Sequence, residues 1–269
     1  NSVVYKIFEN LDFRGIKDFL REVEITYRTS HPCTLQLLGF NLFKNSKKVK
    51  IENPYIATKY FSKGNIRKML NPKLKQSDKR NNDYLKIASL TLNEDESTYE
   101  VRDGTKYTLI IYGIARGMRY LHNLKIDHRD IKTDNIFLDE NDYPHIGDFG
   151  QSKQDEDREN SKKFAGAQFY ADPYAHPKAK GKNLQESQKY QQASDIYSLA
   201  LIFFELYEFH LYPYSFFPEG KSFKSDKIEE NVDSNVCTDK NLRKKLVFKY
   251  APLAARNLIE SMRDKDFSK

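Results

Sequence analysis

The sequence lacks tryptophan and has few cysteines, and this scarcity argues against two classes of protein. Only Cys33 and Cys237 occur, and neither lies in a Cys-x-x-Cys pair or at a Cys/His spacing typical of zinc ligands. Small secreted domains without a large core depend on several disulfides, and structural zinc sites need clustered ligands. We therefore expect neither a disulfide-stapled fold nor a zinc site.

Long hydrophobic runs are also missing. The longest apolar stretches, 109–111 and 199–206, end far short of the roughly 20 residues that a membrane-spanning helix requires. Residues 1–8 lack the charged region, apolar region and small-residue cleavage site of a secretory signal. The sequence therefore predicts no membrane span, and we expect a cytoplasmic location.

Charge of both signs is plentiful, with a modest positive excess. The chain has 269 residues, 45 Lys and Arg against 38 Asp and Glu, and a net charge of +7. Such a balance suits an anionic partner such as nucleic acid, a membrane surface or a nucleotide phosphate, but does not choose among them. The basic residues are spread along the chain without an aromatic-and-basic motif, so we expect no nucleic-acid partner.

The first part of the chain predicts a small sheet and a helix. Residues 3–8, 34–41 and 54–61 are rich in β-branched and aromatic side chains, which favours strands. Apolar residues recur at three- and four-residue steps over 14–27, the period of an amphipathic helix. After a possible short helix, residues 71–104 are polar with weak periodicity, and they are predicted to form a flexible insertion.

The second part of the chain predicts helices. Apolar stripes of helical period run from Leu109 to about His122, over 193–209 and over 242–262. Strands early and helices late predict an α+β architecture with two lobes, a small β-rich one over 1–62 and a mainly helical one over 63–269.

Two short motifs carry the chemistry. Asp130, Lys132 and Asn135 lie between a predicted helix and a polar turn, and Asp148-Phe-Gly follows a short predicted strand at 145–147. Transfer of a phosphoryl group from a nucleotide needs a group that orients the attacking hydroxyl, a cation beside the transferred phosphate, and oxygen ligands for magnesium. Asp130 suits the first task, Lys132 the second, and the side chains of Asn135 and Asp148 the third.

The pattern His-Arg-Asp-x-Lys-x-x-Asn, ending at Asn135 and followed by Asp148-Phe-Gly, resembles the catalytic core of the eukaryotic protein kinases. The resemblance implies ATP and Mg²⁺ as cofactors and Asp130 as the catalytic base, with Asn135 and Asp148 as metal ligands. It also implies an activation segment over 148–174.

The same resemblance accounts for two charged residues upstream. Val-Val-Tyr-Lys, ending at Lys6, resembles the strand lysine motif of the family, and Glu22 resembles the glutamate of its first helix, sixteen residues later. Lys6 would then bind the α- and β-phosphates while Glu22 holds its ammonium group in place. Taken alone, Lys6 would be an edge-strand surface lysine.

Residues 54–64 resemble the hinge strand of the family. Thr58 would control the depth of the pocket behind the adenine, and the backbone of Lys59 and Phe61 would bond the adenine edge. Val4 would cover the base from above and Phe137 from below by apolar contact. Val4 stands where the family usually has alanine, so the slot is predicted to be narrow.

Two further sets of residues resemble structural parts of active kinases. Asp195 matches the buried aspartate that holds the backbone of the catalytic loop, although from sequence alone it could equally be a helix N-cap. Leu37, His128 and Phe149 match three of four stacked side chains that link the lobes. Thr26 takes the fourth position, usually apolar, so we expect a weaker stack there.

Lys132 follows the pattern of serine/threonine kinases. The sequences of the segments 19–23, 31–40 and 112–122 are most similar to the tyrosine-kinase-like group. The implied partners are protein substrates with Ser or Thr hydroxyls. Arg129 is expected to pair with a phosphate on the activation segment, with Ser161 as the first candidate and Ser152 and Tyr170 as weaker ones. The alternative is that Ser161 is a solvent-exposed loop serine without a regulatory role.

The chain also departs from the family pattern. No Gly-rich phosphate loop precedes Lys6, so the family's first two strands are expected to lie outside this sequence. Ala167 and Tyr174 replace a hydroxyl and a glutamate of the activation segment, and Asp127 replaces an apolar residue. These changes leave open the alternative of a catalytically weak or inactive kinase-fold scaffold that binds protein partners.

Overall fold

A computed structural model describes residues 2–9, 12–42, 53–70, 101–154, 170, 172, 191–208, 246, 248 and 251–263. The predicted flexible insertion lies outside the described residues up to position 100. The same holds for most of the activation segment, including Ser161, Ala167 and Tyr174.

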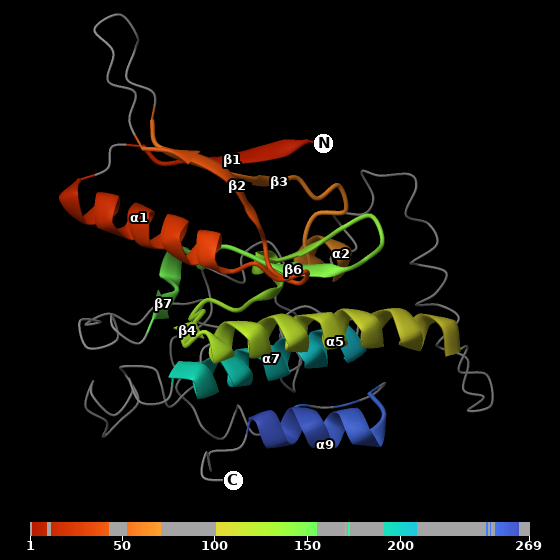
Figure 1. Ribbon diagram of the computed structural model, residues 1–269. Coiled ribbons are helices and arrows are strands. Elements are labelled where there is room, and N and C mark those ends of the chain that lie inside the picture. Colours follow the sequence, from red (N-terminus) through yellow and green to blue (C-terminus); the bar gives the residue numbers. More distant parts are fainter. Residues whose placement is uncertain are drawn as a thin grey trace, which may run out of the picture.

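The chain has an α+β fold, with a small β-rich lobe above a larger helical lobe (Figure 1). The upper lobe holds an antiparallel sheet of order β1-β3-β2, formed by β1 (Val3–Ile7), β3 (Tyr55–Lys59) and β2 (Leu37–Asn41). Helix α1 (Phe13–Arg28) lies against this sheet. All three strands and the helix were predicted, with boundaries that differ by three residues or fewer.

Local sequence explains why α1 begins and ends where it does. The Asp12 side chain accepts a hydrogen bond from the Gly15 amide at 2.7 Å, which caps the first turn. The amide of Thr29 donates to the carbonyl of Ile25 and closes the last turn. The apolar stripe places Phe19 and Val23 against Ile56 of β3, so the helix is fixed to the sheet by a small separate core.

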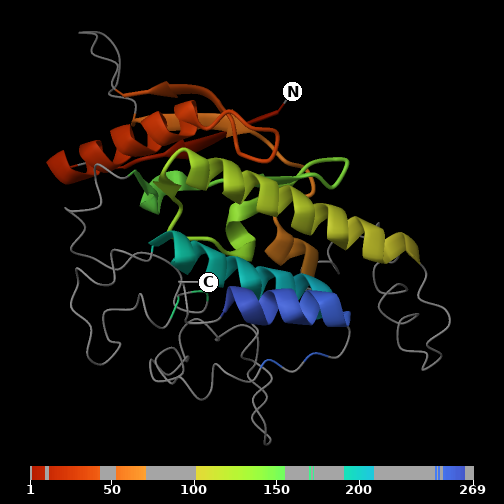
Figure 2. The same cartoon turned by 60° about the horizontal axis from the view of Figure 1, so that its bottom comes forward.

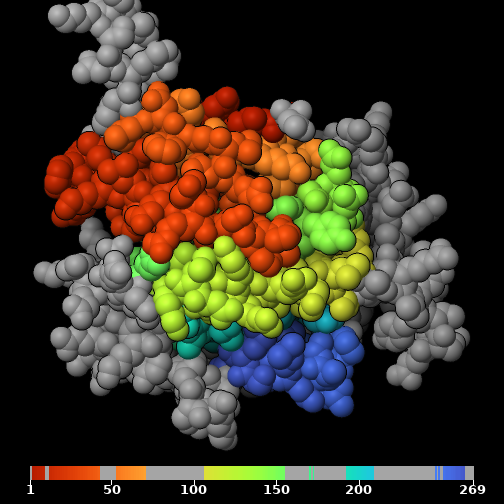
Figure 3. Space-filling model, viewed as in Figure 1, coloured from red at the N-terminus to blue at the C-terminus, as the bar shows by residue number. Residues whose placement is uncertain are grey.

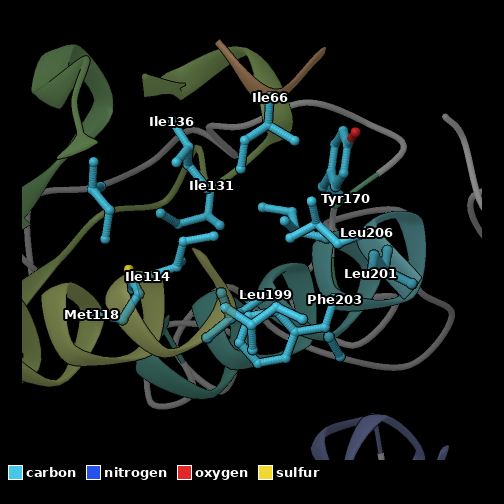
Figure 4. Packing of buried hydrophobic residues seen from close by; sticks show 14 of the residues in the cluster. Ile66, Ile114, Met118, Ile131, Ile136, Tyr170, Leu199, Leu201, Phe203 and Leu206 are labelled. Atoms are coloured by element: carbon cyan, nitrogen blue, oxygen red, sulfur yellow. The ribbon is translucent and has the colours of Figure 1, made fainter. Parts of the chain in front are cut away.

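The lower lobe is built on long helices. Helix α7 (Gln191–Glu208) lies between α5 (Val101–Asn123) and α9 (Leu253–Met262), as Figure 2 shows. The short helix α2 (Ile66–Leu70) joins the same main core, whose side chains interdigitate in Figure 4. On the face shown in Figure 3, residues of the upper lobe lie directly on those of α5.

Short strands and turns connect the lobes. Strands β5 (Ile136–Leu138) and β6 (Pro144–Ile146) form an antiparallel hairpin, and β4 (Ile126–Asp127) pairs with β7 (Lys153–Gln154). Two 3₁₀ turns lie beside the candidate catalytic residues. Turn η2 (Thr133–Asn135) directly follows Lys132, and turn η3 (Phe149–Gln151) directly follows Asp148.

Two predicted helix boundaries in the lower lobe were wrong. Helix α5 begins at Val101, inside the range assigned to the insertion, and Leu109 on its predicted apolar stripe is exposed. Within the stripe over 242–262, Leu246 and Phe248 are not helical, and the described helix begins at Leu253 after Pro252, its N-cap with extended backbone (ψ 155°). Within the described ranges no helix is both long and apolar enough to cross a membrane.

Candidate active site

A charged triad lies between the two lobes. The Nζ atom of Lys6 is 2.7 Å from Oε1 of Glu22 and 2.7 Å from Oδ1 of Asp148. The three side chains come from β1, from α1 and from the turn after β6, so the triad joins elements that are far apart in the sequence. The predicted pairing of Lys6 with Glu22 is thereby confirmed. Lys6 also lies on an edge strand of the described sheet with its side chain 45% exposed, so it is a surface lysine that is held by two carboxylates.

The sheet and helix place these charges by their periodicity. Lys6 is directly opposite Ile56 across β1 and β3, and directly opposed residues point to the same face of a sheet. Ile56 packs on Phe19 of α1, so Lys6 points toward that helix. Glu22 follows Phe19 by almost one turn and is 5% exposed.

The electrostatics of the triad follow from burial and proximity. Burial lowers the pKa of Lys6, but the carboxylates of Glu22 and Asp148 outweigh this and raise it above its ordinary value. Burial raises the pKa of Asp148, but the charge of Lys6 and its hydrogen bond lower it overall. At Glu22 the effect of burial is larger than that of Lys6, and the pKa is raised. The carboxylate of Asp148 is therefore ionised at neutral pH, the form in which its oxygens can bind a metal ion.

The turn at Asp148 needs special backbone geometry. Asp148 has a φ of 60°, in the left-handed region. At Gly150, a Cβ atom would lie 3.1 Å from Oε2 of Glu22 and 3.4 Å from Nζ of Lys6. Glycine lets the turn approach the triad closely, and the Arg21 side chain donates a hydrogen bond to the Gly150 carbonyl at 3.3 Å.

The second cluster lies in the loop between β4 and β5. Oδ2 of Asp130 is 2.9 Å from Nζ of Lys132 and accepts a hydrogen bond from Nδ2 of Asn135 at 3.0 Å. The same amide nitrogen of Asn135 donates to the Asp130 carbonyl at 2.8 Å. The structure therefore brings together the carboxylate, ammonium and amide that the sequence pattern predicted.

Asp195 of α7 fixes the start of this loop. Its Oδ2 accepts the His128 amide and its Oδ1 accepts the Arg129 amide, each at 2.8 Å. Asp195 lies within α7, four residues after its first residue, so the helix N-cap alternative is wrong. The carboxylate holds the strained backbone of Arg129, whose φ is 68°.

His128 is packed in the interior, with a hydrogen-bond contact at each ring nitrogen. It is fully buried, its Nε2 lies 3.0 Å from the Gly147 carbonyl, and its Nδ1 accepts the Asp130 amide at 3.4 Å. A carbonyl only accepts, so the ring carries its proton on Nε2. The ring lies 5.4 Å from that of Phe149, which forms part of the predicted stack. At the fourth position of that stack, the buried Thr26 hydroxyl donates to the Glu22 carbonyl at 2.6 Å.

The β5–β6 hairpin unites the two clusters. Ile136 pairs with Ile146, and the Gly147 amide donates to the Asn135 carbonyl at 2.9 Å. Asn135 and Asp148 therefore lie at the same end of the hairpin. Each side chain has an oxygen of the kind that Mg²⁺ prefers. The described residues contain no group of three His, Cys, Asp or Glu that could hold a metal ion.

The predicted base-binding residues flank this site. Val4 is directly opposite Thr58 across β1 and β3. The Phe61 ring is stacked 5.9 Å from that of Phe137, and Nζ of Lys59 lies 5.7 Å above the Phe61 ring. Phe61 as a whole is 7% exposed. The contacts of these residues with adenine stay predictions.

Two of the three predicted phosphorylation candidates are buried. Ser152 is fully buried and donates to the His128 carbonyl at 3.2 Å, and the Tyr170 side chain is 3% exposed. Both hydroxyls are therefore inaccessible to another kinase in this structure, which contradicts those two predictions. Ser161, the first candidate, lies outside the described residues.

Sequence reasoning missed several residues around the site. Arg67 of α2 is 3.0 Å from Asp134 of η2, and the Asn65 side chain donates to the Asp134 carbonyl at 3.0 Å. Thr133 and Glu205 form a buried network with Tyr170. No periodicity points to these contacts, although a glutamate in the otherwise apolar stretch 199–206 signals a buried partner.

Comparison with known proteins agrees with this geometry. The family described as "Protein kinase domain" matches residues 1–269. The chain is 33% identical over 190 residues to "Probable serine/threonine-protein kinase samkA" of Dictyostelium discoideum, covering 70% of this chain and 23% of that protein. It is 30% identical over 213 residues to "Cysteine-rich receptor-like protein kinase 25" of Arabidopsis thaliana, covering 76% of this chain and 26% of that protein. The chain thus spans about a quarter of the length of these relatives.

Proposed function

This chain belongs to the protein kinase family, and from that premise we propose that it transfers the γ-phosphate of ATP to Ser or Thr hydroxyls of protein substrates. The observation that carries the proposal is the meeting of two clusters, Lys6–Glu22–Asp148 and Asp130–Lys132–Asn135, at one end of the β5–β6 hairpin. The serine/threonine kinases among the relatives support the choice of acceptor.

The first cluster serves to hold the nucleotide. ATP bound with Mg²⁺ supplies the phosphoryl group and the metal that neutralises its charge. Lys6 binds phosphate oxygens, and Glu22 holds the ammonium group of Lys6 in position. Asp148 and Asn135 hold the metal. The ion pair between Lys6 and Asp148 keeps both charges in place for these tasks.

The second cluster serves the acceptor hydroxyl. Asp130 orients the hydroxyl and accepts its proton, while the hydrogen bond from Asn135 fixes the carboxylate. Lys132 lies 2.9 Å from Asp130 and stabilises the negative charge that develops on the transferred phosphate. The reaction needs little covalent chemistry from the protein, so positioning and electrostatics provide most of the rate.

We also propose that a phosphate on Ser161 activates the enzyme through Arg129. The support is the position of Arg129, which directly precedes Asp130 and whose amide is held by Asp195 at 2.8 Å. A phosphate of charge about −2 on Ser161 would accept charge-assisted hydrogen bonds from this guanidinium and so order the activation segment beside the catalytic loop.

The test is transfer of labelled phosphate from ATP to a generic protein acceptor such as casein, in the presence of Mg²⁺. The protein is expressed with any residues that flank the printed sequence in its gene, and Asp130→Asn is the matched control. Transfer that is lost in the variant supports the proposal. Tight Mg²⁺-dependent ATP binding without transfer would overturn it in favour of a scaffold, with Ala167 and Tyr174 as the first residues to restore.

A further inference from the structure

Tyr170 is held at both ends by helix α7. The Ser198 hydroxyl donates to the Tyr170 carbonyl at 2.7 Å, and the Tyr170 hydroxyl donates to Oε2 and Oε1 of Glu205 at 2.9 and 3.0 Å. Ser198 and Glu205 lie two turns apart, about 10 Å along the helix, so the two sets of hydrogen bonds attach Tyr170 to α7 at separate turns. Figure 4 shows this side chain among the buried residues of α7 and the catalytic loop.

The hydrogen bonds in this network have a defined direction. The Tyr170 oxygen is also 2.9 Å from the Thr133 hydroxyl. A carboxylate only accepts, so the single proton of Tyr170 goes to Glu205 and the Thr133 hydroxyl donates to Tyr170. Burial and the charge of Glu205 raise the pKa of Tyr170 well above its ordinary value, which keeps the phenol protonated. We name this chain from Thr133 through Tyr170 to Glu205 the hydroxyl relay.

The hydroxyl relay ends inside the catalytic loop. Thr133 directly follows Lys132 and precedes Asn135 by two residues, and its side chain is fully buried. At the other end of the loop, Asp195 of the same helix holds the amides of His128 and Arg129. The loop is therefore attached to α7 at two points, and Asp130 and Lys132 lie between them.

We propose that Thr133 and Tyr170 are positioning residues, which fix Lys132 and Asp130 by attaching the second end of the catalytic loop to α7. The inference rests on the proposed kinase function for its effect on rate. It also gives Tyr170 a role that couples the predicted activation segment, 148–174, to the catalytic loop. Small displacements of catalytic groups reduce rates strongly, so a single buried hydroxyl can matter.

The experiment compares four single variants with the double variant that combines Thr133→Val and Tyr170→Phe. Thr133→Val and Tyr170→Phe each remove one hydroxyl of the relay, and Thr133→Ser retains it. Thr34→Val is the matched control, because Thr34 is also fully buried and its hydroxyl bonds the carbonyls of Thr29 and His31, outside the relay. For each we measure kcat, KM for ATP, thermal unfolding, and hydrogen exchange of the backbone amides of residues 130–135.

We expect Thr133→Val and Tyr170→Phe to lower kcat by about 10- to 100-fold with KM for ATP changed less than about twofold. The double variant should lose little more than either single variant, since both break the same relay. Thr133→Ser should retain kcat within about threefold. Amide exchange in residues 130–135 should be faster in the two relay variants than in Thr34→Val at a matched margin below the unfolding temperature.

Three results would overturn the proposal: an equal fall of kcat in Thr34→Val, additive losses in the double variant, or unchanged amide exchange in the relay variants. The exchange measurement does not depend on phosphate transfer. If the wild-type protein transfers no phosphate, the proposed function fails, while faster exchange in the relay variants alone still supports the relay and unchanged exchange refutes it.

Discussion

At the scale of single residues, two aspartates in adjacent turns have different surroundings and therefore different expected roles. Asp148 touches the Lys6 ammonium from the upper lobe, whereas Asp130 touches only groups that its own loop supplies in the contacts described above. The proposed function assigns Asp148 to the nucleotide and Asp130 to the acceptor hydroxyl. This difference can be tested by one substitution at each position.

Asp148→Asn should abolish magnesium-dependent ATP binding. The change removes the charge that a metal ion requires and leaves Lys6 with Glu22 as its remaining partner of the triad. Calorimetric titration with Mg²⁺ and ATP measures the effect. Binding of ATP in the absence of metal provides the control, because it should change much less.

Asp130→Asn should leave Mg²⁺-dependent ATP binding intact and lower kcat by several powers of ten, since the amide cannot accept the hydroxyl proton. Steady-state transfer and the same titration measure the two quantities. Equal loss of ATP binding in the Asp130 and Asp148 variants would contradict the assigned roles.

His145 should make stability depend on pH. Burial lowers its pKa below the ordinary 6.5 more than the Asp139 carboxylate, 3.6 Å from Nε2, raises it. The folded state therefore binds this proton less readily than the unfolded state does. The contribution of neutral His145 to stability is complete above about pH 6.5. It is lost as the pH falls through the pKa that His145 has in the folded state. Urea unfolding between pH 7.5 and 5 should show a steeper decline for the wild type than for His145→Gln.

The chemical groups of the site were predictable from sequence, and their connections were only partly so. Spacing identified Asp130 and Asp148, because a short loop and a hairpin keep residues that are close in sequence together in space. Lys6 was identified by the resemblance of its strand to the family's lysine motif. The relay partners Thr133 and Glu205 are separated by 72 positions. Their meeting depends on how α7 packs beneath the loop, and neither helical nor strand periodicity encodes that arrangement.

At the scale of elements, α5 supports the loop that follows α1. Gly113 and Gly117 lie one turn apart on α5, and a Cβ at Gly117 would come within 2.9 Å of the Cys33 carbonyl and 2.8 Å of Cδ1 of Ile146. On the same helix, the Tyr120 ring is stacked 4.9 Å from that of His31. The glycine positions therefore let the backbone of the upper lobe rest directly on a helix of the lower lobe.

Gly117→Ala should destabilise the protein by about 1–3 kcal/mol, although alanine favours a helix, because the backbone at Cys33 has to move. Chemical denaturation measures the loss. Gly39→Ala is the control, since a Cβ at Gly39 meets nothing within 4 Å. Equal stability of the two variants would show that this close contact does not constrain the fold.

Element types were predictable, whereas some ends were not. The apolar stripe of α1 placed that helix to within one residue, and the structure adds the Asp12 cap at its start. The stripe over 242–262 misled because Leu246 and Phe248 join the core from outside any described helix, and Pro252 delays the helix to Leu253. Burial alone produces an apolar pattern whether or not the backbone is helical.

At the scale of the whole molecule, the lobes are joined by charge as well as by packing. Lys6 and Glu22 belong to the upper lobe, and Asp148 belongs to the connecting turn. Arg21 extends this connection from α1 to the Gly150 carbonyl. Any event that changes the charge near Arg21 and Arg129 should therefore affect how the lobes meet.

If Ser161 is the activating position, Ser161→Ala should lower kcat after treatment with an activating kinase by about tenfold or more, while Arg129→Gln should remove the response to phosphorylation. Mass spectrometry of the phosphorylated site, followed by transfer assays, measures both effects. Phosphorylation at Ser161 that leaves kcat unchanged in the wild type would exclude this form of regulation.

Helix α7 carries Asp195 and Glu205, ten positions apart, and each attaches one part of the catalytic loop. Every residue added to a helix turns all later residues of that helix by about 100°. An insertion or deletion of one codon between these positions would rotate one attachment point away from the loop while leaving every side chain present. Substitutions between Asp195 and Glu205 should therefore be tolerated far more readily than insertions or deletions.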